Sequence, residues 1–178
     1  MTRPTISGRF SSERIVGVWD RRRHLLTMEN VPLFTFHNDP QWPLTIVDRY
    51  GKAWRPNRTF DKFDMGSVPL IFQGSVSPIL CPEGFAAHDS GYEFWGLWEV
   101  MPDGVEIFRD LPRAEVDRIC LLDGLEASGV SLYTRHKVYA MVRLGGGGPW
   151  ERSGIGANEA RSARMPPPMP GKDEQQTP

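Results

Sequence analysis

The chain has 178 residues, a length that suits one compact domain with additional terminal segments. Its 21 basic and 22 acidic residues leave a formal net charge of -1, which argues against a nucleic-acid binder that depends on bulk charge. The sequence shows no leader-like apolar stretch and no apolar run long enough to span a bilayer. We therefore expect a protein that is made in a cytoplasm and carries no transmembrane segment.

The first third of the chain predicts a small antiparallel sheet. Residues 1–40 hold short apolar pieces that could be edge strands or an arm lying on a partner. Residues 44–47 and 52–54 flank a turn and predict a hairpin. The alternating pattern of residues 58–63 predicts another short strand. We expect residues 40–63 to form one sheet.

Helices and a second hairpin are predicted between residues 82 and 148. Pro82 favours the first turn of a helix, after which apolar and aromatic residues recur every three or four positions. A hairpin is expected from Glu99 to Arg109, and a second helix opens near Pro112 and stops at Gly129. A third helix is expected over residues 132–144, and the glycines at 145–148 should end it as a flexible joint that opens no helix.

These elements predict an α+β fold: a small antiparallel sheet packed on two or three helices, with extended N- and C-terminal arms. The expected organisation is an N-terminal arm or edge strands at 1–40, a globular domain at 41–150 and a flexible tail at 151–178. The tail is rich in Gly, Pro and charge and cannot order itself alone. Cys81 and Cys120 lie beside apolar residues and should be buried free thiols, unless the two helices bring them close enough to bridge.

The candidate site combines His88, Asp89 and Tyr92 of the first predicted helix with Asp117 of the second. A histidine has a pKa near neutrality that suits general-base work, and a carboxylate on its far nitrogen fixes the tautomer. The same residues could instead form a buried hydrogen-bonded pair that locks two helices together, since buried polar groups need partners. The sequence leaves both interpretations open.

An ordered series of motifs resembles the phage and prophage family catalogued as domain of unknown function 1353. The matching segments, which span about residues 40–150, are Asp64-Met65-Gly66-Ser67-Val68-Pro69, His88-Asp89-x-x-Tyr92, Arg113-x-x-x-Asp117 and Tyr139-Ala140-Met141-Val142-Arg143. Phe63 stands where the family has Thr. The resemblance implies an origin in a tailed phage or prophage, and a place in the virion or in the host cytoplasm during infection.

The His-Asp-x-x-Tyr segment also resembles phospholipase A2. That resemblance implies that His88 is the general base toward a water, that Asp117 holds its other ring nitrogen, and that Tyr92 bonds to Asp117. It further implies that Asp89 binds calcium, a cation that takes several oxygen ligands. The glycine-rich calcium loop of those enzymes is absent, and Asp64 is the candidate substitute ligand, although its position in a turn favours a turn-capping role over ligation.

Two functions from different classes follow from the sequence. One is a virion-associated or lysis-stage hydrolase, with a calcium-dependent site for phospholipid or another ester and a lipid surface as partner. The other is a non-enzymatic virion protein of the tail, neck or baseplate, whose arms bind other phage structural proteins. They are distinguished by whether the second ring nitrogen of His88 faces a cleft open to solvent; a sealed His88 would favour the structural protein.

Overall fold

The computed structural model describes residues 2–15, 33–58, 60, 62–63 and 81–153. Five antiparallel strands form the main sheet, in the spatial order β1-β4-β5-β7-β8. Their bounds are Thr5–Ser7 for β1, Thr45–Val47 for β4, Ala53–Arg55 for β5, Gly96–Val100 for β7 and Glu106–Asp110 for β8. The predicted α+β class is confirmed, and both predicted hairpins, β4–β5 and β7–β8, are present.

The prediction of one sheet over residues 40–63 is wrong. A second sheet has the order β2-β3-β6, with β2 at Phe10–Ile15, β3 at Leu33–Asn38 and β6 at Lys62–Phe63. Pro56 follows β5 directly and lacks the N–H that would continue its ladder. The chain then turns, with the Phe60 N–H donating to the Asn57 carbonyl at 3.1 Å, and β6 pairs with β3 instead of β5.

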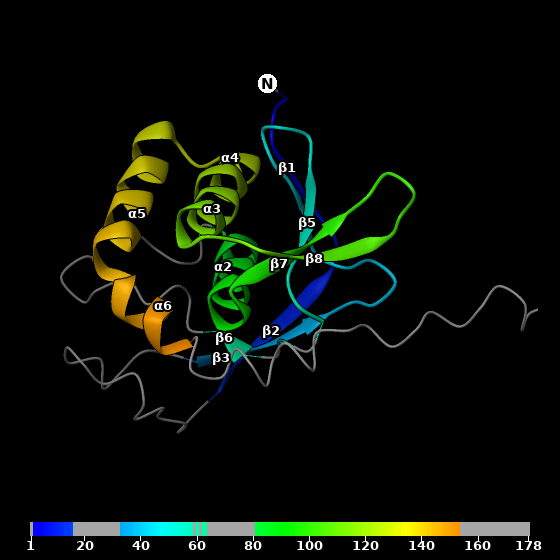
Figure 1. Ribbon diagram of the computed structural model, residues 1–178, viewed down its shortest axis with the longest axis horizontal. Coiled ribbons are helices and arrows are strands. Elements are labelled where there is room, and N and C mark those ends of the chain that lie inside the picture. The colour runs from blue at the N-terminus through cyan, green and yellow to red at the C-terminus, as the bar shows by residue number, and fades with distance from the viewer. Residues whose placement is uncertain (1, 16–32, 59, 61, 64–80, 154–178) are drawn as a thin grey trace, which may run out of the picture.

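The helices gather beside the main sheet (Figure 1). Helix α2 spans Pro82–Phe94; α3 spans Arg113–Asp117 and continues through a π-helical segment at Arg118–Asp123 into α4 at Gly124–Ala127. Helix α5 spans Leu132–Gly145 and α6 spans Gly147–Ser153. Gly129 has a φ of 77°, the left-handed conformation that suits glycine after a helix, as predicted. The expectation that the glycine run opens no helix is wrong, because α6 begins within it at Gly147.

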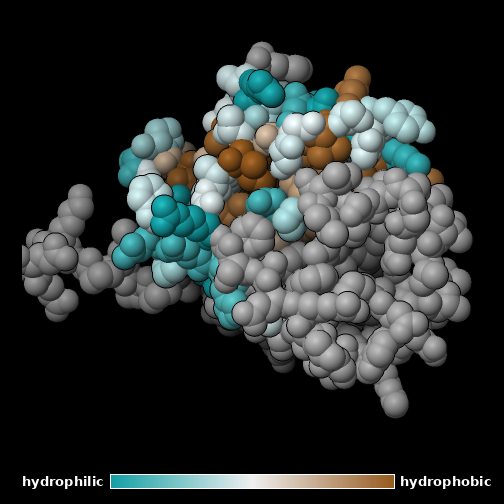
Figure 2. Space-filling model, turned by 180° about the vertical axis from the view of Figure 1, so that it is seen from behind, coloured by the Kyte–Doolittle hydropathy of each residue, from teal (hydrophilic) through white to brown (hydrophobic). Residues whose placement is uncertain are grey.

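The hydrophobic core lies between the main sheet and the helices. Ile46 and Trp54 of the sheet pack with Phe85 of α2 and with Ile119 and Leu121 of the π-helical segment. Both cysteines are buried and free, as predicted. At the outer surface, hydrophobic side chains lie among hydrophilic ones (Figure 2). Within the described residues, no helix is long and apolar enough to cross a membrane.

The N-terminal strand belongs to the main sheet. Strand β1 pairs with β4 through Ile6 and Ile46, and Ile6 packs partly buried against the core. At the other end of the described chain, Trp150 of α6 also packs against the core. The predicted tail at 151–178 therefore begins inside a helix, and residues 154–178 lie outside the described residues.

Candidate functional site

The two helices that carry the candidate residues pack antiparallel. Cys81, at the start of α2, lies 3.7 Å from the Gly124 carbonyl, whereas His88, about two turns further on, contacts Asp117. Residue numbers therefore rise along α2 while they fall along its neighbour. This arrangement brings one face of α2 onto α3 and the π-helical segment, as the sequence predicted.

Gly91 allows this close approach. A Cβ atom at this position would lie 2.5 Å from Cγ1 of Val116 on α3, a distance that packed carbon atoms do not reach. The absence of a side chain thus lets α2 approach α3 closely enough for His88 and Tyr92 to meet Asp117. A glycine in mid-helix lowers helix propensity, and here a packing requirement explains it.

Asp117 is the centre of the network. His88 Nε2 lies 2.9 Å and the Tyr92 hydroxyl 2.8 Å from its Oδ1 atom. Arg143 of α5 donates from Nη1 to Oδ2 at 3.0 Å, and Arg113 Nε approaches the same oxygen at 4.0 Å. Both carboxylate oxygens are therefore engaged, and Asp117 joins α2, α3 and α5.

The pKa of Asp117 lies below its ordinary value. Burial by itself raises the pKa, because Asp117 is 0% exposed. Hydrogen bonds from His88, Arg143 and Tyr92 outweigh that effect and favour the carboxylate. Tyr92 shows the opposite shift: burial, and then the charge of Asp117, raise its pKa, so its hydroxyl remains a donor.

The second ring nitrogen of His88 faces another carboxylate. Nδ1 lies 3.4 Å from Oδ1 of Asp89, and the residue is 2% exposed. Burial lowers the pKa of His88, but the hydrogen bonds to Asp117 and Asp89 outweigh it and raise the pKa to about 9. At neutral pH the side chain is therefore an imidazolium held between two carboxylates, and it is sealed from solvent.

Aromatic rings cover the other side of the network. The Tyr92 ring lies 4.2 Å from the His88 ring and 5.0 Å from the Trp150 ring, both measured between centroids. Trp95 ends α2 in the left-handed conformation with a φ of 56° and donates from Nε1 to the Trp150 carbonyl at 3.0 Å. Helix α6 thereby closes over the end of α2 and over Tyr92.

The predicted calcium ligands are only partly placed. Asp89 lies beside His88, whereas Asp64 lies outside the described residues. The described part of the chain holds no group of three or more His, Cys, Asp or Glu side chains that could ligate a metal. Calcium takes six to eight oxygen ligands, and the described residues offer Asp89 alone of the predicted pair. The calcium site therefore stays a prediction.

Sequence reasoning missed the roles of two arginines. Arg143 was part of a motif to which no role was given, although it provides a cationic partner of Asp117. Arg113 donates from Nη2 to the Arg143 carbonyl at 2.8 Å and so ties α3 to the end of α5. The signal for Arg113 was its spacing of four residues from Asp117, which places both on one helical face.

Comparisons with known proteins add no relative. No family model matches the chain, no curated protein matches it, and no solved structure matches it. The resemblances to domain of unknown function 1353 and to phospholipase A2 therefore rest on the motif residues alone.

Proposed function

We propose that this chain is a non-enzymatic structural protein of a phage or prophage particle, in which the network around Asp117 holds three helices in register. The sealed environment of His88 carries this proposal: the side chain is 2% exposed, and carboxylates face both ring nitrogens. A general base needs a free nitrogen within reach of a water. The phage origin is supported by the ordered series of motifs.

The network is well suited to a structural role. Asp117 accepts hydrogen bonds from α2 and α5 while it belongs to α3, so one buried carboxylate sets the relative positions of three helices. Every one of these bonds has a normal length, and the charge on Asp117 is balanced by His88 and Arg143. Buried charges are tolerated when they are paired in this way.

An ester hydrolase is the second candidate, and the arrangement of the ring nitrogens favours it. His88 holds Asp117 through Nε2 at a normal 2.9 Å, whereas the contact of Nδ1 with Asp89 is long at 3.4 Å. Nδ1 is thus the nitrogen that would exchange its partner for water. In this mechanism neutral His88 takes a proton from that water as it attacks the ester carbonyl, and Asp117 stabilises the imidazolium that forms. The imidazolium then returns the proton to the leaving alkoxide as the ester C–O bond breaks.

The two proposals give different results for one set of proteins: the wild type and the variants His88→Ala, Asp117→Asn and Asp89→Asn. Fatty-acid release from phospholipid vesicles, with and without calcium, is measured together with thermal melting. His136→Ala is the matched control, because His136 lies exposed on α5. The structural proposal predicts no hydrolysis by the wild type and a lower melting temperature for His88→Ala.

The hydrolase predicts another outcome for the same assay. The wild type would release fatty acid, His88→Ala would abolish turnover, and Asp117→Asn would reduce turnover by about two to four orders of magnitude, as the loss of an orienting carboxylate does elsewhere. Asp89→Asn would lose activity that excess calcium partly restores. Turnover by the wild type that His88→Ala eliminates would overturn the structural proposal.

A component of a particle should also be found in it. We expect mass spectrometry of purified particles to detect the chain at a fixed ratio to the major structural proteins. Deletion of residues 155–178 should leave the melting temperature of the isolated protein nearly unchanged, because the described core ends before this segment, and should weaken incorporation. Particles that consistently lack the chain would contradict the virion assignment.

A further inference from the structure

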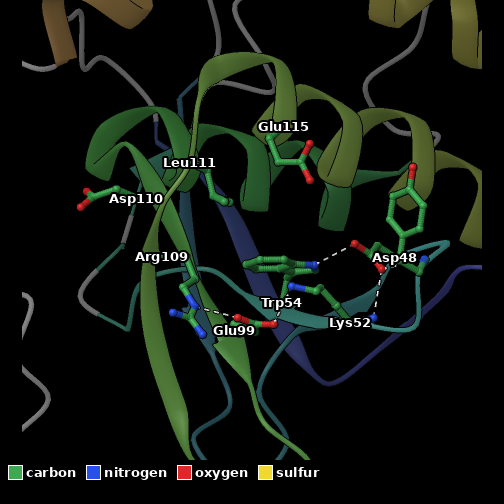
Figure 3. A pocket seen from close by; sticks show the side chains of 9 residues that line it. Asp48, Lys52, Trp54, Glu99, Arg109, Asp110, Leu111 and Glu115 are labelled. Carbon is green, nitrogen blue, oxygen red and sulfur yellow. Dashed lines mark hydrogen bonds and ion pairs between the residues drawn. The ribbon is translucent and has the colours of Figure 1, made fainter.

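A hollow of about 340 Å³ lies between α3 and the part of the main sheet formed by the β4–β5 hairpin and by β7 and β8, apart from the network around His88. In Figure 3, Glu115 extends from α3 toward the Trp54 ring, and the Glu99–Arg109 pair lies on the opposite side of that ring. The lining shares no residue with the His88 network. It consists of Asp48, Tyr50, Lys52, Trp54, Glu99, Arg109, Asp110, Leu111 and Glu115.

The floor of the hollow is held rigidly by Asp48, which is 0% exposed. Its Oδ1 accepts from the backbone N–H groups of Tyr50 at 2.9 Å and Lys52 at 3.0 Å, which fixes the turn of the hairpin. Its Oδ2 accepts from Trp54 Nε1 at 3.1 Å and from Arg118 Nη2 at 3.2 Å. A site fixed in this way loses little conformational entropy when a ligand binds.

The charges around the hollow are already paired. Glu99 accepts from Lys52 at 3.0 Å and from Arg109 at 2.7 Å, on different oxygens. Arg118 donates to Glu115 at 2.6 Å as well as to Asp48. Because each of these carboxylates has a cationic partner, neither a cationic nor an anionic ligand meets an uncompensated charge. A neutral ligand leaves the ion pairs intact and can use their remaining donors and acceptors.

An aromatic ring stands at the hollow and remains accessible. Tyr50 is 61% exposed, while the Arg118 guanidinium lies 4.9 Å from the centre of its ring. Trp54, by contrast, is 4% exposed and forms part of the floor. Arg118 is also the first residue of the π-helical segment, a rare geometry that is frequent at functional sites. The hollow therefore offers one apolar ring surface beside a set of paired polar groups.

We propose that this hollow binds one ring of a neutral saccharide. Sugar hydroxyls both donate and accept hydrogen bonds, so they can bond to the Glu99 and Glu115 oxygens and to the Lys52 and Arg109 N–H groups without disturbing the ion pairs. The C–H face of the sugar packs on the Tyr50 ring. The volume is at the lower end of the range of about 300–1,000 Å³ for small-molecule sites, which suits a single ring.

The indole N–H signal of Trp54 in a ¹⁵N–¹H correlation spectrum reports directly on the floor of the site, and Trp54→Phe identifies that signal. The probes are methyl β-glucopyranoside, methyl β-galactopyranoside, methyl α-mannopyranoside and N-acetylglucosamine, each titrated at millimolar concentrations. Choline and acetate serve as the cationic and anionic comparators. We expect at least one sugar to shift the Trp54 signal to saturation, and neither comparator to do so.

Tyr50→Ala should weaken sugar binding about tenfold, the effect of losing roughly 1.4 kcal/mol of contact. Tyr133→Ala is the matched control, because Tyr133 is 76% exposed on α5 and does not line the hollow; it should bind sugar as the wild type does. The proposal is overturned if no sugar shifts the Trp54 signal, if choline or acetate alone does, or if Tyr50→Ala binds sugar with unchanged affinity.

Discussion

Replacing Asp117 with asparagine tests the network most directly, because the variant keeps the shape of the side chain and removes its charge. Asp117 is 0% exposed and faces the cationic groups of His88 and Arg143. Removing one partner of a buried ion pair costs about 3–5 kcal/mol. Arg143 is partly exposed, so water screens its share of the loss. We expect Asp117→Asn to lower the free energy of unfolding by about 3–5 kcal/mol, near the lower end of that range.

His88→Ala should cost less, about 1–3 kcal/mol. It removes the hydrogen bond to Asp117 and the longer one to Asp89, but Asp117 keeps the bonds from Tyr92 and Arg143 and is not left unpaired. Urea unfolding followed by circular dichroism measures both variants, with His136→Ala as the surface control expected to lie within about 0.5 kcal/mol of the wild type. If Asp117→Asn unfolded at the same urea concentration as the wild type, or His88→Ala cost more than Asp117→Asn, Asp117 would not be the centre of the network.

Three further predictions concern pH, thiols and helix packing. The pKa of His88 in the folded protein, about 9, lies above its ordinary value of 6.5, so the stability that charged His88 contributes is fully present below pH 6.5 and is lost as the pH rises toward 9. Urea unfolding across that pH window should show the difference in free energy of unfolding between wild type and His88→Ala becoming smaller. A constant difference would contradict a charged His88. Burial raises the pKa of both Cys81 and Cys120, so iodoacetamide at pH 8 should label neither cysteine in the native protein and both in the urea-unfolded protein, as detected by mass spectrometry. Rapid labelling of the native protein would show that the cysteines are exposed. Gly91→Ala should destabilise the protein by about 1–3 kcal/mol through its clash with α3. Gly124→Ala is the control: its Cβ would meet its nearest atom at 3.5 Å, so this variant should be neutral or stabilising in the same urea assay. Equal effects of the two substitutions would rule out the close approach at Gly91.

Local spacing in the sequence determined much of the helical face that carries the site. His88 and Tyr92 are four residues apart, and this alone places their side chains together on one face of α2. Prolines and glycines likewise indicated where α2 begins and where the helical run that starts at Arg113 stops, because their effects on the backbone act within a turn or two. The two hairpins were predicted from the alternation of apolar and polar residues and from the composition of their turns, which are also local properties of the sequence.

Contacts between residues distant in the sequence were decided by the tertiary structure. Arg143 reaches Asp117 across 26 positions, and Asp48 reaches Arg118 across 70, and no local pattern specifies either pairing. The sequence is compatible with β6 extending the β4–β5 ladder, but β6 pairs with β3. The partner of a strand depends on which other strand the folded chain places beside it, and no local pattern gives that information. From the sequence, His88 could be either a general base or part of a buried polar network that holds two helices together. Asp89 is the next residue of α2, so its contact with Nδ1 is local, whereas the packing of Asp117 against Nε2 depends on how α2 and α3 meet, which only the folded chain defines.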